Sequence, residues 1–249
     1  MSVDLELLTR YLRQRRDLGV REVFLDELTS AEALAALGTL ARGGPPAARQ
    51  PSVDRGAASG PSPAAEGLRL LATEVMGCTR CRLHAGRNSV VFGEGNPEAR
   101  LVVVGEAPGQ EEDRTGRPFV GPAGKLLDLM LLSVGFPRES VFICNVLKCR
   151  PPHNRDPQRD EIEACSGYLH RQLELIEPRV LLAVGRFAAQ TLTGSDANIG
   201  RLRGRVHEYM GIPVIVTYHP AYLLRSPDRT RAAWQDLQFM REVLDGLSQ

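Results

Sequence analysis

Five cysteines are the first residues of this chain whose types and spacing could do chemistry. Cys78 and Cys81 form a Cys-x-x-Cys pair, and Cys149 and Cys165 follow far downstream. Four thiolates brought together can hold zinc or an iron–sulfur cluster, and the spacing of the second pair does not separate the two. A set of buried or free thiols is the plain alternative. Cys144 lies in an apolar run and is expected to stand apart from the other four.

Three polar segments form a second candidate site. They are Gly105-Glu-Ala-Pro-Gly109, Asn145 with the loop that follows it, and His219-Pro220. Each comes at or near the end of a short apolar run, which predicts a buried strand. Ligands of open α/β sheets bind outside the carboxyl ends of the strands. The sequence therefore predicts that these three distant segments meet at one edge of a sheet.

The elements that would position these segments alternate along the chain. Short apolar runs predict four strands, over 101–104, 141–147, 179–184 and 213–218. Apolar residues at helical spacing predict helices over 123–134, 162–176, 186–192 and 229–247. The second of these helices is expected to begin before its first apolar residue, with Asp156 as N-cap and Pro157 as first helical residue. The alternation predicts an α/β fold, in which a mostly parallel sheet has helices on both faces.

Composition divides the chain into three regions. Residues 1–42 have the spacing and the strong helix formers of a helical N-terminal extension. Residues 43–65 consist mainly of Gly, Pro, Ser and Ala, and they cannot bury enough apolar surface to fold, so we expect a flexible linker. Residues 66–249 contain the alternating strands and helices and are expected to form the main domain.

The overall composition is that of an ordinary globular protein, with 43% apolar and 24% charged residues. The 31 Lys and Arg nearly balance the 30 Asp and Glu, so any basic surface must be local. No apolar run approaches the roughly 20 residues that span a bilayer, so no membrane partner is expected. The first residues lack the pattern of a secretory signal. We therefore expect a cytoplasmic protein whose cysteines are ligands or free thiols rather than disulfides.

Taken in order, the motifs resemble the family-4 uracil-DNA glycosylases from about residue 70 to residue 247. The matching segments are VVVGEAPGQEED at 102–113, GRPFVG at 116–121, GKLLD at 124–128, NVLKCRPP at 145–152, NRDP at 154–157 and YHPAYLLR at 218–225. Glu106 argues against the family-5 relatives, which lack an acid at this position. The cross-linking relatives carry a basic insert with a histidine nucleophile, whereas the segment 114–118 is short and has no histidine, so a covalent DNA adduct is not expected.

The resemblance implies a monofunctional uracil-DNA glycosylase, which hydrolyses the N-glycosidic bond of a uracil flipped out of DNA and so starts base excision repair. It also implies a four-stranded, mostly parallel sheet between helices and a [4Fe–4S] cluster. By position, the cluster ligands would be Cys78, Cys81, Cys149 and Cys165. The expected partner is uracil-containing DNA, double- or single-stranded, and the enzyme is expected to be a monomer.

The chemistry of uracil release defines what the site needs. Departing uracil carries negative charge on O2 and O4, so the site needs a stacking surface, donors to these oxygens and a positioned water. By resemblance, Phe119 stacks on the base, Asn145 reads its edge and His219 donates to O2 as a neutral imidazole. An amide can donate to O4 while it accepts from N3–H, which is the reverse of the pattern of cytosine. A core phenylalanine, a buried asparagine and a satisfied core histidine are the plain alternatives.

Loop residues complete the site that the resemblance implies. Gly105 allows close backbone approach, Ala107 positions the attacking water through its backbone, and Glu106 helps to hold the loop or the water. Glu112 is expected near uracil C5, where it would exclude the thymine methyl group, and Asn154 is expected to orient the substrate backbone. Both acids could instead be loop-stabilising charges.

Late in the chain, basic and apolar residues could contact DNA. Tyr222-Leu-Leu224 could wedge into the space left by the flipped base. Six arginines could neutralise phosphates, with a solvated charged edge as the alternative for each. They are Arg201, Arg203 and Arg205, which are expected to share one face of an extended segment, and Arg225, Arg229 and Arg231.

Two other functions remain open on the residues alone. One is a non-catalytic iron–sulfur module that binds DNA or serves a polymerase or primase, and it would retain DNA without creating abasic sites. The other is a zinc-stabilised nucleotide-binding protein, whose purified preparation would be colourless.

Overall fold

The computed structural model describes residues 60–247, and the predicted helical extension over 1–42 lies outside them. The first described helix, α3 (Pro63–Met76), begins inside the stretch predicted as a linker. Ser62 caps it, because its hydroxyl accepts from the Ala65 amide at 3.3 Å, and Pro63 suits the first helical position. The prediction of a linker over 43–65 is therefore wrong at residues 63–65, which are helical. Residues 43–59 lie outside the part of the chain that the structure describes.

The sheet has six strands in the order β1-β3-β2-β4-β6-β5. The inner four are parallel to one another and correspond to the predicted strands: β2 (Leu101–Gly105), β3 (Phe142–Asn145), β4 (Val180–Val184) and β6 (Ile212–Thr217). Their almost unbroken apolar sequences suit strands that are covered on both faces. The edge strands β1 (Glu94–Gly95) and β5 (His207–Tyr209) are antiparallel and were not predicted, because they are short and have no apolar alternation.

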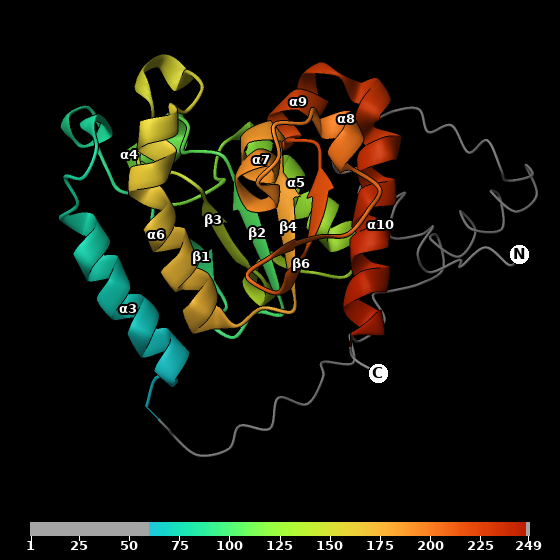
Figure 1. Cartoon of the computed structure of the whole chain (residues 1–249), viewed down its shortest axis with the longest axis horizontal. Coiled ribbons are helices and arrows are strands. Elements are labelled where there is room, and N and C mark those ends of the chain that lie inside the picture. Colours follow the sequence, from blue (N-terminus) through green and yellow to red (C-terminus); the bar gives the residue numbers. More distant parts are fainter. Residues whose placement is uncertain (1–59, 248–249) are drawn as a thin grey trace, which may run out of the picture. The chain divides into compact units, whose positions relative to one another are not determined.

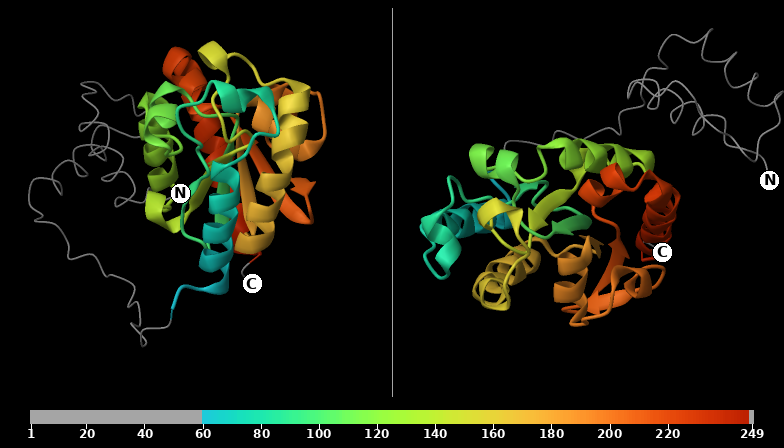
Figure 2. Two further views of the ribbon diagram at one scale, coloured as in Figure 1. Left: turned by 90° about the vertical axis from the view of Figure 1, so that its left-hand side faces the viewer. Right: turned by 90° about the horizontal axis from the view of Figure 1, so that it is seen from above.

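Helices cover both faces of this sheet (Figures 1 and 2). One face packs on α3, α6 (Arg159–Ile176), α7 (Arg186–Thr193) and α8 (Ile199–Leu202), and the other packs on α5 (Pro122–Ser133), α9 (Pro220–Arg225) and α10 (Thr230–Gly246). Within β2 the side chains alternate between the two cores, with Val102 and Val104 in the first and Leu101 and Val103 in the second. The predicted α/β class is thus confirmed, with two more strands than expected.

Short helices complete the connections between these elements. They are η1 (Arg82–Ala85), α4 (Gln110–Thr115), η2 (Arg138–Ser140), η3 (Pro152–Asn154) and η4 (Pro227–Arg229). None of the helices among residues 60–247 is both long enough and apolar enough to cross a membrane.

The start of α6 differs from the prediction. Gln158 is the N-cap, and the Glu161 carboxylate accepts from its backbone amide at 2.9 Å in a capping box. The predicted cap, Asp156, instead forms an ion pair with Arg186 at 2.8 Å. The helix begins two residues after Pro157, at Arg159, because the Glu161 carboxylate caps it by accepting from the Gln158 amide.

The extended segment predicted over 201–205 is also wrong. Asn198 caps the short helix α8, so Arg201 is helical. The Arg203 guanidinium lies 2.6 Å from the buried carboxylate of Asp236 and 4.4 Å from the Tyr218 ring centroid, while Arg205 donates to the Arg201 carbonyl. These three arginines do not form one phosphate-binding face, and Arg203 serves to attach α10 instead.

Candidate active site

The three predicted polar segments do meet at the carboxyl ends of the parallel strands. Gly105 ends β2 and pairs in register with Asn145, which ends β3. On the other side of β2, Val184 of β4 is in register with Thr217 of β6, and His219 follows two residues later. The chain crosses to β3 on one side of β2 and to β4 on the other, so this edge is the switch point at which open α/β sheets bind ligands.

Gly105 is the point of closest approach in this site. A Cβ at Gly105 would lie 2.3 Å from Asn145 Oδ1 and 2.6 Å from two atoms of the Phe119 ring. No side chain larger than hydrogen fits there without moving both groups. The sequence prediction that Gly105 serves close approach is consistent with these distances, although the approaching atoms belong to two of the predicted site residues.

Phe119 joins His219 to the same site. Their ring centroids are 5.6 Å apart and the planes are inclined by 28°, which is a stacked arrangement. Gly185, just after β4, packs on the histidine, because a Cβ there would lie 3.0 Å from His219 Cβ. Phe119, Asn145 and His219 therefore lie on one edge of the sheet, as the sequence predicts, and not on separate surfaces.

His219 is a neutral donor in this geometry. It is the N-cap of α9, and its Nδ1 accepts from the Ala221 amide at 3.1 Å. A backbone amide can only donate, so the ring hydrogen resides on Nε2. Burial, with a smaller contribution from the nearby Arg225 cation, lowers the pKa of His219 to about 4. The imidazole thus presents an Nε2–H group and no positive charge at neutral pH.

Asn145 carries the clearest vacant hydrogen-bonding position. Its Oδ1 is buried, and no group in residues 60–247 donates to it. A buried acceptor without a donor costs about 1–3 kcal/mol, so such atoms are rare outside functional sites. The backbone beneath it is held by the buried Lys148, whose Nζ donates to the Asn145 carbonyl at 2.7 Å and to Gln172 Oε1 at 2.5 Å.

Glu112 ties two loops together. Its Oε2 accepts from the Gly109 amide at 3.1 Å, and its Oε1 accepts from the Val120 and Gly121 amides at 2.9 Å each. The carboxylate is thus engaged with three backbone donors, which is the geometry of the loop-stabilising alternative. It still lies close enough to His219 for its charge to act on the pKa of the imidazole.

Glu106 and Ala107 form the loop after β2, and both are half-buried. Burial, together with the nearby charge of Asp156, raises the pKa of Glu106 to about 7, and the Arg186 cation opposes the shift. The Glu106 carbonyl accepts from the Leu147 amide at 3.0 Å, so this loop is fixed to the end of β3. Titratable groups with raised pKa values in such positions are typical of active sites.

Asn154 is the predicted site residue that lies apart from these groups. It is exposed on η3, and its Oδ1 accepts from Arg150 at 2.7 Å. Its backbone and that of His153 adopt positive φ angles, near 54° and 55°, which makes the loop a sharp protrusion. Among the described residues, its side chain forms no hydrogen bond with Phe119, Asn145 or His219.

Four of the five cysteines line one small cavity, and they are the predicted set: Cys78, Cys81, Cys149 and Cys165. Arg87 donates to Cys149 Sγ and the Lys148 amide donates to Cys165 Sγ, both at 3.3 Å. Cys144 is fully buried in β3 and does not line the cavity. In residues 60–247 no three His, Cys, Asp or Glu side chains converge closely enough to hold a single metal ion.

Apolar and basic side chains follow His219 at the surface. Tyr222 is 37% exposed and Leu224 is 51% exposed on α9, and Arg225 is exposed at its end. Arg229 forms an ion pair with its neighbour Asp228 at 3.1 Å, and Arg231 is exposed at the start of α10. The segment 222–225 is therefore available for contact with a partner beside the site.

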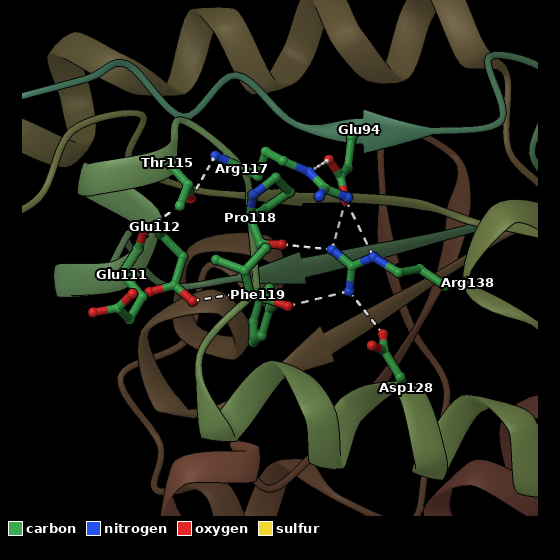
Figure 3. A network of polar contacts seen from close by, with 10 residues as sticks. Glu94, Glu111, Glu112, Thr115, Arg117, Pro118, Phe119, Asp128 and Arg138 are labelled. Carbon is green, nitrogen blue, oxygen red and sulfur yellow. Dashed lines mark hydrogen bonds and ion pairs between the residues drawn. The ribbon is translucent and has the colours of Figure 1, made fainter.

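Sequence reasoning missed the polar network beside the loop of Phe119, in which Arg138 donates to the loop carbonyls (Figure 3). Arg138, Glu94, Asp128 and Arg117 belong to four different elements or loops, and all of them have charged partners within this network. Spacing along the chain gives no signal for it, because its members are brought together only by the tertiary fold.

Comparisons with known proteins find one family. Residues 92–238 match the model of the uracil DNA glycosylase superfamily. The type-4 uracil-DNA glycosylase of Archaeoglobus fulgidus is 49% identical over 72% of this chain and 94% of its own length, and that of Thermotoga maritima is 46% identical over 69% and 91%. A type-5 uracil-DNA glycosylase of Pyrobaculum aerophilum is 34% identical over 52% of this chain and 64% of its own.

The His219 tautomer can be measured directly by nitrogen-15 NMR, with His219→Gln used to assign the signal. We expect an Nε2–H imidazole whose pKa is about 4, because protonation would put charge in a buried site and break the bond from the Ala221 amide. An Nδ1–H tautomer, or titration at the ordinary value near 6.5, would contradict the proposed donor geometry.

Proposed function

The chain belongs to the uracil-DNA glycosylase superfamily and to its type-4 branch, and we propose that it excises uracil in the pocket formed by Phe119, Asn145 and His219. As a uracil-DNA glycosylase it acts in DNA repair. The observation that carries the assignment of the pocket is the buried Asn145 Oδ1 without a donor, 2.3 Å from the Cβ position of Gly105 and beside the Phe119 ring.

Asn145 accounts for the choice of uracil. A uracil flipped into the pocket would offer N3–H to the vacant Oδ1 and O4 to the amide NH₂ group. Cytosine offers an acceptor at N3 and a donor at C4, so the same amide would face two mismatched contacts. In the free enzyme the buried Oδ1 has no donor, and in the complex it would have one. The free energy of uracil binding should therefore gain what the unpaired acceptor costs, roughly 1–3 kcal/mol.

His219 and Phe119 act on the departing base. The Nε2–H of the neutral imidazole donates to O2 as negative charge develops there, and it needs no change of protonation state to do so. The Phe119 ring stacks on the base and excludes water from its face. Breaking the bond between uracil N1 and sugar C1′ then leaves a stabilised uracil anion.

The loop of Glu106 and Ala107 is the proposed place of the attacking water. The water oxygen forms a bond to sugar C1′, and the proton of the water passes to a protein group that acts as general base. A carboxyl group whose pKa is about 7 suits this role near neutral pH. Glu112 holds the loop in place through the Gly109 amide and would limit the space near uracil C5.

The set of four cysteines that lines this cavity suits a [4Fe–4S] cluster, because four thiolates are its usual ligands. Tetrahedral zinc needs all four sulfurs at about 2.3 Å from one point, and no three His, Cys, Asp or Glu side chains in residues 60–247 converge in that way. Amide and guanidinium donors to Cys165 and Cys149 suit the negative charge of ligating thiolates. When bound, the cluster would join the loop after α3 to the end of β3 and to α6, and the glycosylase reaction requires no electron transfer from it.

DNA, double- or single-stranded, is the proposed partner of a monomeric enzyme acting in the cytoplasm. Tyr222 and Leu224 are exposed three and five residues after His219, where an apolar wedge could occupy the space of the flipped base. Arg225 lies beside them and would neutralise a phosphate. The domain boundary at residue 66 moves to the start of α3 in this proposal, and residues 1–42 are proposed as a separate extension.

Asn145→Asp and His219→Ala should each slow single-turnover release of uracil by about 100-fold or more, because each removes a donor to a base oxygen. Abasic sites cleaved by alkali measure the rate, and visible absorbance reports the cluster, which should be unchanged. Matched controls are Asn198→Asp, which keeps the cap of α8, and His170→Ala on the exposed face of α6. Wild-type release in both site variants would remove the assignment.

Cysteine replacement separates the cluster from the remaining thiol. Cys165→Ala should lose visible absorbance, together with iron and acid-labile sulfide, and should lower the melting temperature. Cys144 is also buried but lies outside the cavity. Cys144→Ala should therefore keep the visible absorbance, the iron and the acid-labile sulfide, and should lose only a little stability. Equal iron in the two variants, or zinc in place of iron in the wild type, would reject the proposed ligands.

A further inference from the structure

Phe119 has an unusual backbone. Its φ is 50°, in the left-handed region, which costs a residue with a bulky side chain roughly 1–3 kcal/mol. The first turn of α5 lies directly against it, because a Cβ on Gly124 would be 1.8 Å from the Phe119 carbonyl oxygen. This conformation turns the ring toward Gly105, so the surrounding structure must hold the loop in place.

Arg138 holds the carbonyl side of this loop. Its Nη2 donates to the Pro118 carbonyl at 2.5 Å and its Nη1 donates to the Phe119 carbonyl at 3.2 Å (Figure 3). The same guanidinium donates to Asp128 at 2.7 Å and twice to Glu94, at 2.8 and 3.1 Å. These five contacts engage all three guanidinium nitrogens, and a lysine ammonium could not reproduce the planar arrangement.

Glu112 holds the amide side of the same loop. Its Oε1 accepts from the Val120 and Gly121 amides, directly after the two carbonyls that Arg138 binds. Three consecutive peptide groups, from 118–119 to 120–121, are thus fixed between a cation from η2 and an anion from α4. Arg138 is only 22% exposed, so its contacts are less screened by water than those of a surface pair.

We propose that Arg138 is a positioning residue for base stacking. By binding the Pro118 and Phe119 carbonyls, it keeps the Phe119 ring beside Gly105, in the position from which the ring would stack on uracil. Glu94 and Asp128 in turn orient the guanidinium. The inference rests on the proposed stacking role of Phe119. Arg138 touches neither Asn145 nor His219 in the described residues, so its effect on the reaction must pass through the loop.

The test is a double-mutant cycle of Arg138→Gln with Phe119→Ala, measured as the single-turnover rate of uracil release by the full chain with its cluster. We expect Arg138→Gln to slow release about 10-fold or more, since a ring displaced by about 1 Å can cost up to 100-fold. Once the ring is absent there is nothing to position, so the double variant should match Phe119→Ala within about twofold.

Arg117→Gln is the matched control. Arg117 also binds Glu94, at 2.7 and 3.0 Å, but donates through its side chain to no carbonyl of the loop, and it is 61% exposed. Its replacement should change the rate by less than about twofold. Arg138→Lys keeps the charge and replaces Arg138→Gln in the cycle if the glutamine variant does not fold, with the same criterion applied to the double variant.

The outcomes separate this inference from the proposed site. The positioning role would be overturned if Arg138→Gln released uracil at the wild-type rate. It would also be overturned if the rate reductions of Arg138→Gln and Phe119→Ala multiplied in the double variant. Phe119→Ala at the wild-type rate would instead overturn the stacking role itself. A slow Phe119→Ala variant beside an unaffected Arg138→Gln variant would reject only the role of Arg138.

Discussion

The missing side chain at Gly105 is the constraint on which the site depends. Because β2 ends in a residue without a Cβ, the Asn145 amide from β3 and the Phe119 ring from the next loop can approach the same point from two sides. Parallel pairing of β2 and β3 fixes the amide, and the left-handed backbone of Phe119 fixes the ring. His219, stacked on that ring, completes a site whose parts come from separate stretches of the chain.

The three side chains proposed to contact uracil, Phe119, Asn145 and His219, carry no charge at neutral pH. The imidazole is held uncharged by burial and by the Ala221 amide, and the nearby carboxylate of Glu112 is occupied by three backbone donors. Other charged groups act through the loops: Arg138 fixes the loop of Phe119, and Asp156 and Arg186 act on the pKa of Glu106. A site arranged in this way can stabilise charge that appears only as uracil leaves.

The sequence was sufficient for the inner strands and for the meeting of three polar segments at their carboxyl ends, because buried parallel strands are continuous apolar runs and such ends are known binding positions. The roles of Phe119, Asn145 and His219 came from the family resemblance and stay predictions. Edge strands β1 and β5 carry no such pattern. Asp156 looked like a helix cap, yet Arg186, thirty residues later, forms an ion pair with it. The roles of Arg138 and Arg203 were equally hidden, since their partners lie 10–44 and 29–33 residues away along the chain.

Uracil release by Gly105→Ala tests the pocket most directly. The added methyl group must displace the Asn145 amide and the Phe119 ring, so we predict a folded protein that keeps its visible absorbance and releases uracil about 100-fold more slowly or worse. Gly167→Ala, in a helix with open space around the new Cβ, should retain the wild-type rate. Wild-type release by Gly105→Ala would contradict the proposal that uracil is bound between these groups.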